Sequence, residues 1–227
     1  MMSLAVQLLL VAGSFFSDHA EEAARAQTFF DTHTEIVPTL RQYLSDDQAR
    51  MALAVVAPEV CVYSSLSDWA ETRTLTILYV QQGRGDFSIG PFQMKPSFVE
   101  RLEREVRSDA RLQPLFSDLL IPTQQGSPEQ QLRSERCRRL ERMQSLHWQL
   151  RYLSLFITLA ERRTSQLPSG FSEAKLLYWA TLYNAGLDCD DDRIKRLQQV
   201  KSFPRRSRDY NYASVALEFY YSSYSNK

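Results

Sequence analysis

The segment SDDQARMALAVVAPEV, residues 45–60, constrains the fold of this chain more than any other stretch. Ser45 suits a helix N-cap, and the two aspartates after it favour a helix start because they face the positive end of the helix dipole. From Met51 to Ala57 every residue is apolar, so no face of this helix can be turned to water. The sequence therefore predicts a helix that runs through the middle of the protein and ends at Pro58 and Glu59.

Apolar residues at three- and four-residue spacing predict further helices along most of the chain. Their ranges are 18–43, 65–83, 96–109, 139–163 and 169–186, with an aromatic helix in 202–224 and a surface loop at 121–134. Only 7 glycines occur among 227 residues, which argues against an all-β sandwich. We therefore expect an all-α fold, with room for short strands only around residues 76–92.

A chain of 227 residues can form one large domain, or one domain with a small appendage. Residues 1–13 contain the apolar run LAVQLLLVAG, which is too short to span a bilayer. This run is either a cleaved signal peptide, which would export the protein, or an apolar first helix. Residues 14–44 are expected to form an N-terminal helical segment and residues 45–227 the main domain, and no other segment is a candidate membrane span.

Charge and metal-binding residue types argue against several functions. Lysine and arginine number 27, as do aspartate and glutamate, so the net charge of zero gives no global attraction to nucleic acid. The three cysteines lack metal-ligand spacing. The three histidines are scattered without a matching acid or cysteine, so we expect no catalytic triad, no metal site and no cofactor.

Glu59 is the first residue that can carry chemistry. It follows the apolar helix and precedes Val60, Cys61 and Val62. Apolar surroundings disfavour the charged form of a carboxyl group, so we expect a raised pKa and a proton donor near neutral pH. Protonating a glycosidic oxygen requires such a donor. The competing interpretation is a glutamate that turns outward at a helix end.

The stretch DFSIGPFQMKPSF, residues 86–98, lies between two predicted helices and is unusually apolar for a connecting loop. Gly90 would let the backbone approach a ligand closely. Ser88 and Gln93 offer neutral hydrogen-bonding groups, and Met94 offers an apolar wall, which together suit the hydroxyls and acetamides of a sugar. A tight helix-to-helix loop explains the glycine and the final proline, but it leaves Gln93 within an apolar run unexplained.

Two motifs follow later in the chain. LYNAG, residues 182–186, places Tyr183 and Asn184 at the predicted end of a helix, just before a glycine of the kind that terminates helices. SRDYNY, residues 207–212, places Tyr210 ahead of the last helix. Each motif alone is compatible with an ordinary helix boundary.

The order of these four features resembles that of the lytic transglycosylases and goose-type lysozymes, in the lysozyme-like superfamily that cleaves bacterial cell-wall glycan. That family's apolar helix ends in a catalytic glutamate within A-I-A-x-x-E-S, which corresponds here to ALAVVAPEV and to Glu59. The family motifs S-x-G-x-x-Q-x-x-P, A-x-Y-N-A-G and T-R-x-Y correspond to SIGPFQMKP, ATLYNAG and SRDY. Matching residues besides the acid are Ser88, Gly90, Gln93, Pro96, Tyr183, Asn184, Ala185, Gly186, Arg208 and Tyr210, with Met94 beside them.

The resemblance covers residues 45–224 and departs from the family at two points. The serine that usually follows the acid is Val60 here. An inserted segment, SLSDWAETRTLTILYV, lengthens the separation between Glu59 and Gln93. This segment also brings in Glu71 as a competing acid, although its polar neighbours suit that role less well.

The resemblance implies a lysozyme-like helical domain in which the 86–98 loop lines a glycan groove opposite Glu59. Gln93 and Met94 would support the acid, Tyr183 would hydrogen-bond the same carboxylate, and Asn184 would hold the glycan. The implied partner is the peptidoglycan glycan strand, and the implied location is the periplasm or cell envelope.

The implied activity is cleavage of the β-1,4 bond between N-acetylmuramic acid and N-acetylglucosamine. A lytic transglycosylase uses one glutamate as acid and then as base, whereas a hydrolytic lysozyme needs a second acid, for which Asp86 is the candidate. The alternatives are a non-catalytic glycan-binding or scaffold protein with a degenerate groove, and a helical interaction protein in which the motifs are accidental.

Overall fold

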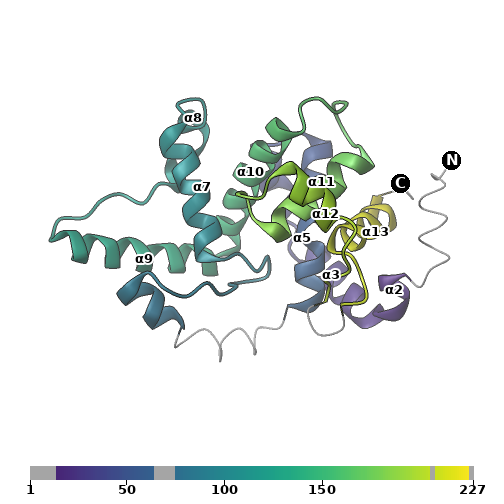
Figure 1. Ribbon diagram of the computed structural model, residues 1–227, viewed down its shortest axis with the longest axis horizontal. Coiled ribbons are helices and arrows are strands. Elements are labelled where there is room, and N and C mark those ends of the chain that lie inside the picture. Colours follow the sequence, from purple (N-terminus) through teal and green to yellow (C-terminus); the bar gives the residue numbers. More distant parts are fainter. Residues whose placement is uncertain (1–13, 64–74, 205–207, 225–227) are drawn as a thin grey trace. The chain divides into compact units, whose positions relative to one another are not determined.

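The structure is a computed structural model that describes residues 14–63, 75–204 and 208–224 (Figure 1). These residues are mainly helical and contain no strand, so the expected all-α fold is confirmed. The candidate signal peptide and Glu71 lie outside the described residues. Within the described ranges, no helix has both the length and the apolar character needed to cross a membrane.

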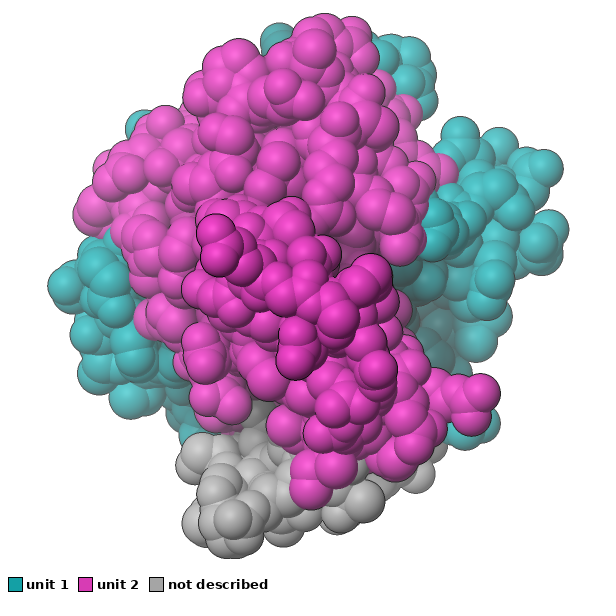
Figure 2. Space-filling view, turned by 90° about the vertical axis from the view of Figure 1, so that its left-hand side faces the viewer, with its two compact units in different colours: residues 1–37, 46–62, 164–227 teal, residues 38–45, 63–163 magenta. Residues whose placement is uncertain are grey.

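The chain divides into two compact units, which Figure 2 shows in different colours. Unit 1 consists of Met1–Val37, Asp46–Val62 and Thr164–Lys227, and unit 2 consists of Pro38–Ser45 and Tyr63–Arg163. The N-terminal segment 14–44 therefore contributes to both units. The first boundary between the two units falls inside helix α4 (Ile36–Leu40), between Val37 and Pro38.

Unit 1 is built around helix α5 (Asp46–Val62), and every residue from Met51 to Ala57 is buried. Helices α3 (Ala20–Thr32), α11 (Glu173–Ala185) and α13 (Tyr212–Tyr224) pack against it. Helices α2 (Phe15–Asp18) and α12 (Asp191–Leu197) complete the unit. An apolar helix without a polar face needs such cover, because each exposed apolar side chain would forfeit about 1.5–3 kcal/mol of burial free energy.

Helix α5 does not end at Pro58 and Glu59, as its sequence predicts, but continues to Val62. Proline removes one main-chain donor and crowds the preceding turn, which usually ends or kinks a helix. The packing of α3, α11 and α13 around α5 outweighs this local cost. Glu59 consequently lies within the last turns of the helix rather than after it.

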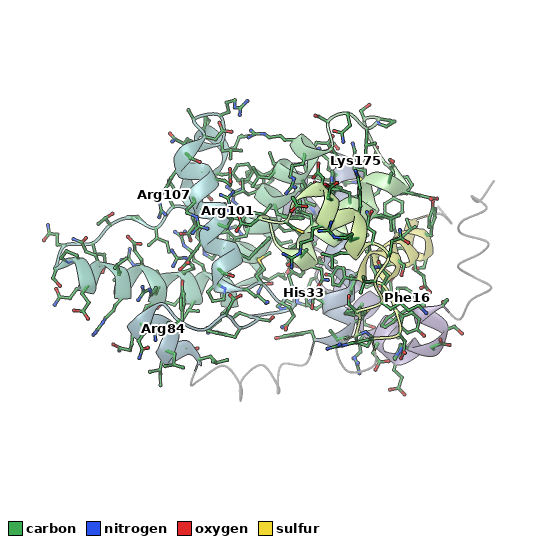
Figure 3. All side chains as sticks on the ribbon, in the orientation of Figure 1. Phe16, His33, Arg84, Arg101, Arg107 and Lys175 are labelled. Atoms are coloured by element: carbon green, nitrogen blue, oxygen red, sulfur yellow. The ribbon has the colours of Figure 1, made fainter. Side chains whose placement is uncertain are left out.

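Unit 2 contains a helical segment at residues 75–82, then α7 (Pro96–Ser108), α8 (Gln113–Phe116) and the 3-10 turn η1 (Ser117–Leu119). Helices α9 (Pro128–Gln144) and α10 (Leu146–Arg163) follow, and both pack against α7. Gly83 ends the 75–82 segment in a left-handed conformation, with φ at 67°, and Arg84 follows it (Figure 3).

Two predicted boundaries in unit 2 are wrong. Helix α9 begins at Pro128, inside the stretch expected to be a loop, because Ser127 and Gln130 form a reciprocal capping box at its start. The helix expected over residues 139–163 is two helices, because Ser145 adopts an extended conformation between α9 and α10.

The strands considered around residues 76–92 are not formed in the described part of the chain. Residues 75–82 are helical, and only an isolated antiparallel bridge joins Ile89 to Met94. The bridge closes directly on the four-residue turn Gly90–Gln93, whose ends are joined by a hydrogen bond from Gln93 N to Gly90 O. A ladder cannot extend beyond it because Pro96 lacks an N–H and opens α7 two residues later.

A buried ionic network joins three helical segments of unit 2. Arg139 of α9 donates to both carboxylate oxygens of Glu103 on α7, at 3.1 and 2.8 Å. Its third nitrogen donates to the Tyr79 hydroxyl at 2.6 Å and to Glu100 at 3.1 Å. Glu103 is fully buried and Arg139 is 4% exposed. Arg139 is the cation that holds the Glu103 carboxylate by direct hydrogen bonds, and Arg107 of α7 lies 3.8 Å from the same carboxylate.

We expect Arg139→Leu to lower the free energy of unfolding by about 3–5 kcal/mol, because it leaves the buried Glu103 carboxylate without its two direct hydrogen bonds to a cation and with only the longer contact to Arg107, at 3.8 Å. The double variant Arg139→Leu/Glu103→Leu should recover most of that loss. Urea unfolding measures both. The control is Arg133→Leu on the same helix, which removes an exposed ion pair with Glu129 and should cost less than about 1 kcal/mol. Equal losses for Arg139→Leu and Arg133→Leu would contradict the assignment.

Candidate functional site

Glu59 is half-buried in the last turns of α5, between the buried residues Pro58 and Val60. The helix that carries Glu59 is covered by other helices, so the side chain of Glu59 is only partly exposed. Two tyrosines of unit 1 accompany it, Tyr183 from α11 and Tyr212 from α13.

Tyr212 is 2% exposed and Tyr183 is 8% exposed. The Tyr212 hydroxyl donates to the main-chain oxygen of Val55, one turn before Glu59 on α5, at 3.0 Å. The Glu59 side chain lies close enough to the same phenol for its charge to act on it. Tyr183 lies close enough to Glu59 for the charge of that carboxylate to act on it, and Tyr183 acts in turn on Tyr212. Three chain segments thus bring one acid and two phenols together in unit 1.

Burial raises the pKa of Tyr183 well above its ordinary value, and the nearby Glu59 carboxylate raises it further. Burial likewise raises the pKa of Tyr212, followed by the charge of Glu59 and the effect of Tyr183. Both phenols therefore keep their protons at any physiological pH and act as neutral hydrogen-bonding groups beside the acid.

Asn184 and Gly186 lie where the LYNAG motif predicts. Helix α11 ends at Ala185, and Gly186 caps it with φ at 92° and an N–H bond to Leu182 O. Asn184 is exposed in the last turn, next to the buried Tyr183. Within this motif, the Tyr183 side chain is buried near Glu59, and the Asn184 side chain is exposed to solvent.

Tyr210, which the resemblance assigns to the site, belongs to a different cluster of unit 1. Its hydroxyl donates to Asp18, which raises the pKa of Tyr210 to about 12. Its ring packs edge-on against Phe15 and His19. Tyr212, two residues later, is a second tyrosine besides Tyr183 on which the charge of Glu59 acts.

Sequence reasoning missed Tyr212, although a signal for it is present. Asn211 caps α13, because its side-chain oxygen accepts from the main-chain N–H groups of Ala213 and Ser214. The helix therefore starts at Tyr212, and helical spacing places that residue on one stripe with Val215, Ala216 and Phe219, all of which are buried. The capping Asn211 therefore indicates that Tyr212, the first residue of the helix, is the tyrosine that is buried.

The remaining predicted residues lie in unit 2, where the space beside Gly90 is filled by protein. A Cβ atom on Gly90 would come within 1.8 Å of the side-chain nitrogen of Gln149, a fully buried residue of α10. We expected this glycine to permit close approach of a glycan. The structure instead shows a close approach of Gln149, in a turn where Gly90 has φ at 69°.

Gln93 and Met94 also have roles within the loop itself. Gln93 adopts a left-handed conformation with φ at 49°, and its amide nitrogen donates to Gly90 O at 2.8 Å. Met94 is only 1% exposed and forms part of the core of unit 2. Ser88 is half-buried immediately before the Ile89–Met94 bridge.

Asp86, the candidate second acid, is exposed at the start of the same loop. It accepts from Ser97 N at 3.3 Å, in the first turn of α7, and lies 3.8 Å from the ammonium group of Lys95. A carboxylate at a helix N-terminus is stabilised by the helix dipole. This local role accounts for an aspartate at position 86.

The structure offers no metal centre in the ranges it describes, since no group of three or more histidine, cysteine or acidic side chains is close enough to hold an ion there. Glu59, Tyr183 and Tyr212 instead form a group of titratable side chains that affect one another's pKa values. Proton transfer is the chemistry that such a set can perform.

Tyr183 and Tyr212 predict a loss of stability in alkaline solution. An unfolded tyrosine ionises near pH 10, whereas these two keep their protons when folded. Their contribution is therefore complete below about pH 10 and declines as the pH rises further, because unfolding then releases protons. Tyr183→Phe and Tyr212→Phe should each reduce the fall in unfolding free energy by up to about 1.4 kcal/mol per pH unit. Urea unfolding between about pH 9 and 12 measures the slope, and slopes equal to the parent's would contradict the burial of these phenols.

No protein-family model, no curated protein and no solved structure matches the chain. The resemblance to the lysozyme-like superfamily therefore depends on the residues of this chain alone.

Proposed function

We propose that this protein is a peptidoglycan lytic transglycosylase in which Glu59 is the single catalytic acid and base. One observation carries the proposal: Glu59, in the last turns of an apolar helix, lies close enough to Tyr212 and to Tyr183 of the LYNAG motif for its charge to act on both buried phenols. The tyrosine of that motif is the residue that the resemblance places beside the acid. A helix boundary alone does not require this pairing.

The proposed reaction moves one proton out and one proton back through Glu59. Protonated Glu59 gives its proton to the glycosidic oxygen as the bond to C1 of N-acetylmuramic acid breaks, and the N-acetylglucosamine end leaves as an alcohol. The C6 hydroxyl of the same muramic residue then attacks C1, and its proton passes to the Glu59 carboxylate. A 1,6-anhydro product forms without water, and the acid regains its starting state.

The two phenols support this cycle as neutral neighbours of the acid. The proton of Tyr212 is held by Val55 O. Because burial keeps Tyr183 and Tyr212 neutral, neither phenol competes with Glu59 as a proton source.

A non-catalytic glycan-binding or scaffold protein is the second candidate function. The 86–98 loop favours it, because Gln93 is hydrogen-bonded within the turn and Met94 is buried in the core. Neither side chain is thereby arranged to contact an acid. The two candidates differ in one property, which is whether Glu59 transfers a proton to bound glycan.

Glu59→Gln should retain the fold and lose activity on purified sacculi by about 10²- to 10⁴-fold, because the amide keeps the shape of the side chain but cannot deliver a proton. Mass analysis of released muropeptides measures the activity. Glu35→Gln, an exposed residue of the same unit, is the matched control and should release fragments at the parent's rate. Full activity in Glu59→Gln would remove this residue from the mechanism, and an inactive parent that still binds sacculi would favour the scaffold.

The released fragments should end in 1,6-anhydro-muramic acid and should take up no labelled oxygen from heavy-oxygen water. The reason is that the described part of unit 1 places one carboxyl group, that of Glu59, with the two phenols. A labelled reducing end, together with loss of activity in Asp86→Asn, would show hydrolysis with Asp86 as the second acid.

A further inference from the structure

The two units carry opposite net charges, which the neutral total of the chain conceals. The sequence of unit 2 contains 16 lysines and arginines and 12 aspartates and glutamates, a net charge of +4. Unit 1 contains 11 and 15 of these residues, a net charge of −4. In unit 2 all the cations except Lys95 are arginines, the residue type that binds phosphate through two parallel N–H groups. Unit 2 is therefore the part of the protein that attracts anions.

Several exposed arginines lie where α7 ends and α8 begins (Figure 1). We call this region, residues 104–115 together with Arg162, the α7–α8 tip. Arg104 and Arg107 are exposed on the last turns of α7, and Arg111 follows in the connection to α8. Arg162 of α10 reaches the same place, because its side chain donates to Asp109.

Asp109, which follows the last residue of α7, holds two of these arginines. Arg111 donates from Nε to Oδ1 and from Nη2 to Oδ2, both at 3.0 Å. Arg162 donates from Nη1 to Oδ2 at 2.6 Å. The hydrogen bonds from Arg111, followed by that from Arg162, lower the pKa of Asp109, so its carboxylate stays ionised. One negative charge is thus shared by two positive charges, and the group keeps a net charge of +1.

The two guanidinium groups keep donors for a further anion. A guanidinium has five N–H donors, of which Arg111 uses two on the Asp109 carboxylate and Arg162 uses one. The side chain of Asp109 is 18% exposed, against 81% for Arg111 and 38% for Arg162. An anion that approaches from solvent therefore meets the guanidinium groups more readily than the carboxylate.

Helix electrostatics explain only part of this arrangement. Cations near the end of a helix are stabilised by the helix dipole, which accounts for Arg107 and Arg111. That effect does not require Arg162, which comes from another helix. Exposed ion pairs contribute little to stability, so a second arginine on one acid is not explained by stability either. A pair of arginines oriented by one carboxylate is suited to bind a phosphate group.

An exposed leucine belongs to the same tip. Leu115 of α8 is 54% exposed, and α8 packs against α7. Asp118, the acid that follows it, is paired with the buried Arg151. Apolar side chains next to cations are typical of membrane-binding surfaces, because the apolar group enters the acyl boundary while the cations bind the head groups. A soluble polyanion such as nucleic acid gives an exposed leucine no comparable environment.

We propose that the α7–α8 tip of unit 2 binds the phosphate head groups of an anionic phospholipid membrane. Arg111 and Arg162 bind the phosphate, and Leu115 supplies the apolar contact. Glu59 and its phenols belong to unit 1, so this site does not depend on the proposed function.

The test measures cosedimentation of the full chain with vesicles made of equal parts phosphatidylcholine and phosphatidylglycerol. The protein should bind these vesicles, should not bind pure phosphatidylcholine vesicles, and should bind less tightly as salt is added. Arg111→Gln/Arg162→Gln should weaken binding by about tenfold to thirtyfold. The matched control Arg84→Gln/Arg133→Gln removes the same charge from exposed residues of unit 2 outside the tip (Arg84 is labelled in Figure 3). Its effect should stay below about threefold.

Equal weakening in the two double variants would show a general effect of charge and would overturn the site. All four replaced side chains are exposed, so both variants should melt close to the parent. Binding to double-stranded DNA without binding to the mixed vesicles would assign the tip to nucleic acid and overturn the proposal.

A second comparison tests the apolar contact. Leu115→Ser should weaken binding to the mixed vesicles by about threefold to tenfold, because the leucine no longer enters the acyl boundary. Leu132→Ser is the control, since Leu132 of α9 is 50% exposed and lies outside the tip. Binding that is unchanged in Leu115→Ser, or weakened equally in both variants, would contradict a membrane as the ligand of this tip.

Discussion

Helix α5 has no polar side, so it can exist only where other helices cover it, and unit 1 is the result of that requirement. Helices α3, α11 and α13 provide the cover. In doing so they bring Tyr183 and Tyr212 to the end of α5, where Glu59 lies. The same packing keeps the helix continuous through Pro58. The placement of the acid and the two phenols therefore follows from hydrophobic burial, and their chemistry follows from the desolvation that comes with it.

Unit 2 is subject to a different constraint. Several polar and charged side chains are buried in it, and burial of such groups is costly unless they have hydrogen-bonding or ionic partners. Arg139 and Glu103 compensate each other between α7 and α9. Gln149 does the same for main-chain groups of the loop and of α9. Low polarity makes an unpaired group costly and a satisfied network rigid. These polar contacts therefore fix the local conformation of unit 2 more closely than apolar packing alone would.

The two candidate functions make different demands on these arrangements. Catalysis needs an acid whose proton can leave and return, and Glu59 has two neutral phenols near it. A scaffold would need only a fixed glycan-binding surface, without proton transfer. The carboxyl group and its phenols have no evident purpose in a scaffold, which is why the enzymatic proposal is preferred.

The sequence alone determined the helical character of the chain and the central apolar helix, because periodicity and composition report local burial. The nearness of Tyr183 to Glu59 was expected from the family resemblance, and in the structure the charge of Glu59 acts on Tyr183. The sequence misjudged the end of α5 and the helix start at Pro128, and it did not single out Tyr212. It also gave Gly90 and Gln93 a ligand, where the structure shows Gln149 and an internal hydrogen bond. Only the tertiary structure decided these points. Contacts such as that between Gly90 and Gln149 join residues far apart in the chain, and a linear pattern carries no record of which distant side chain will fill a given space.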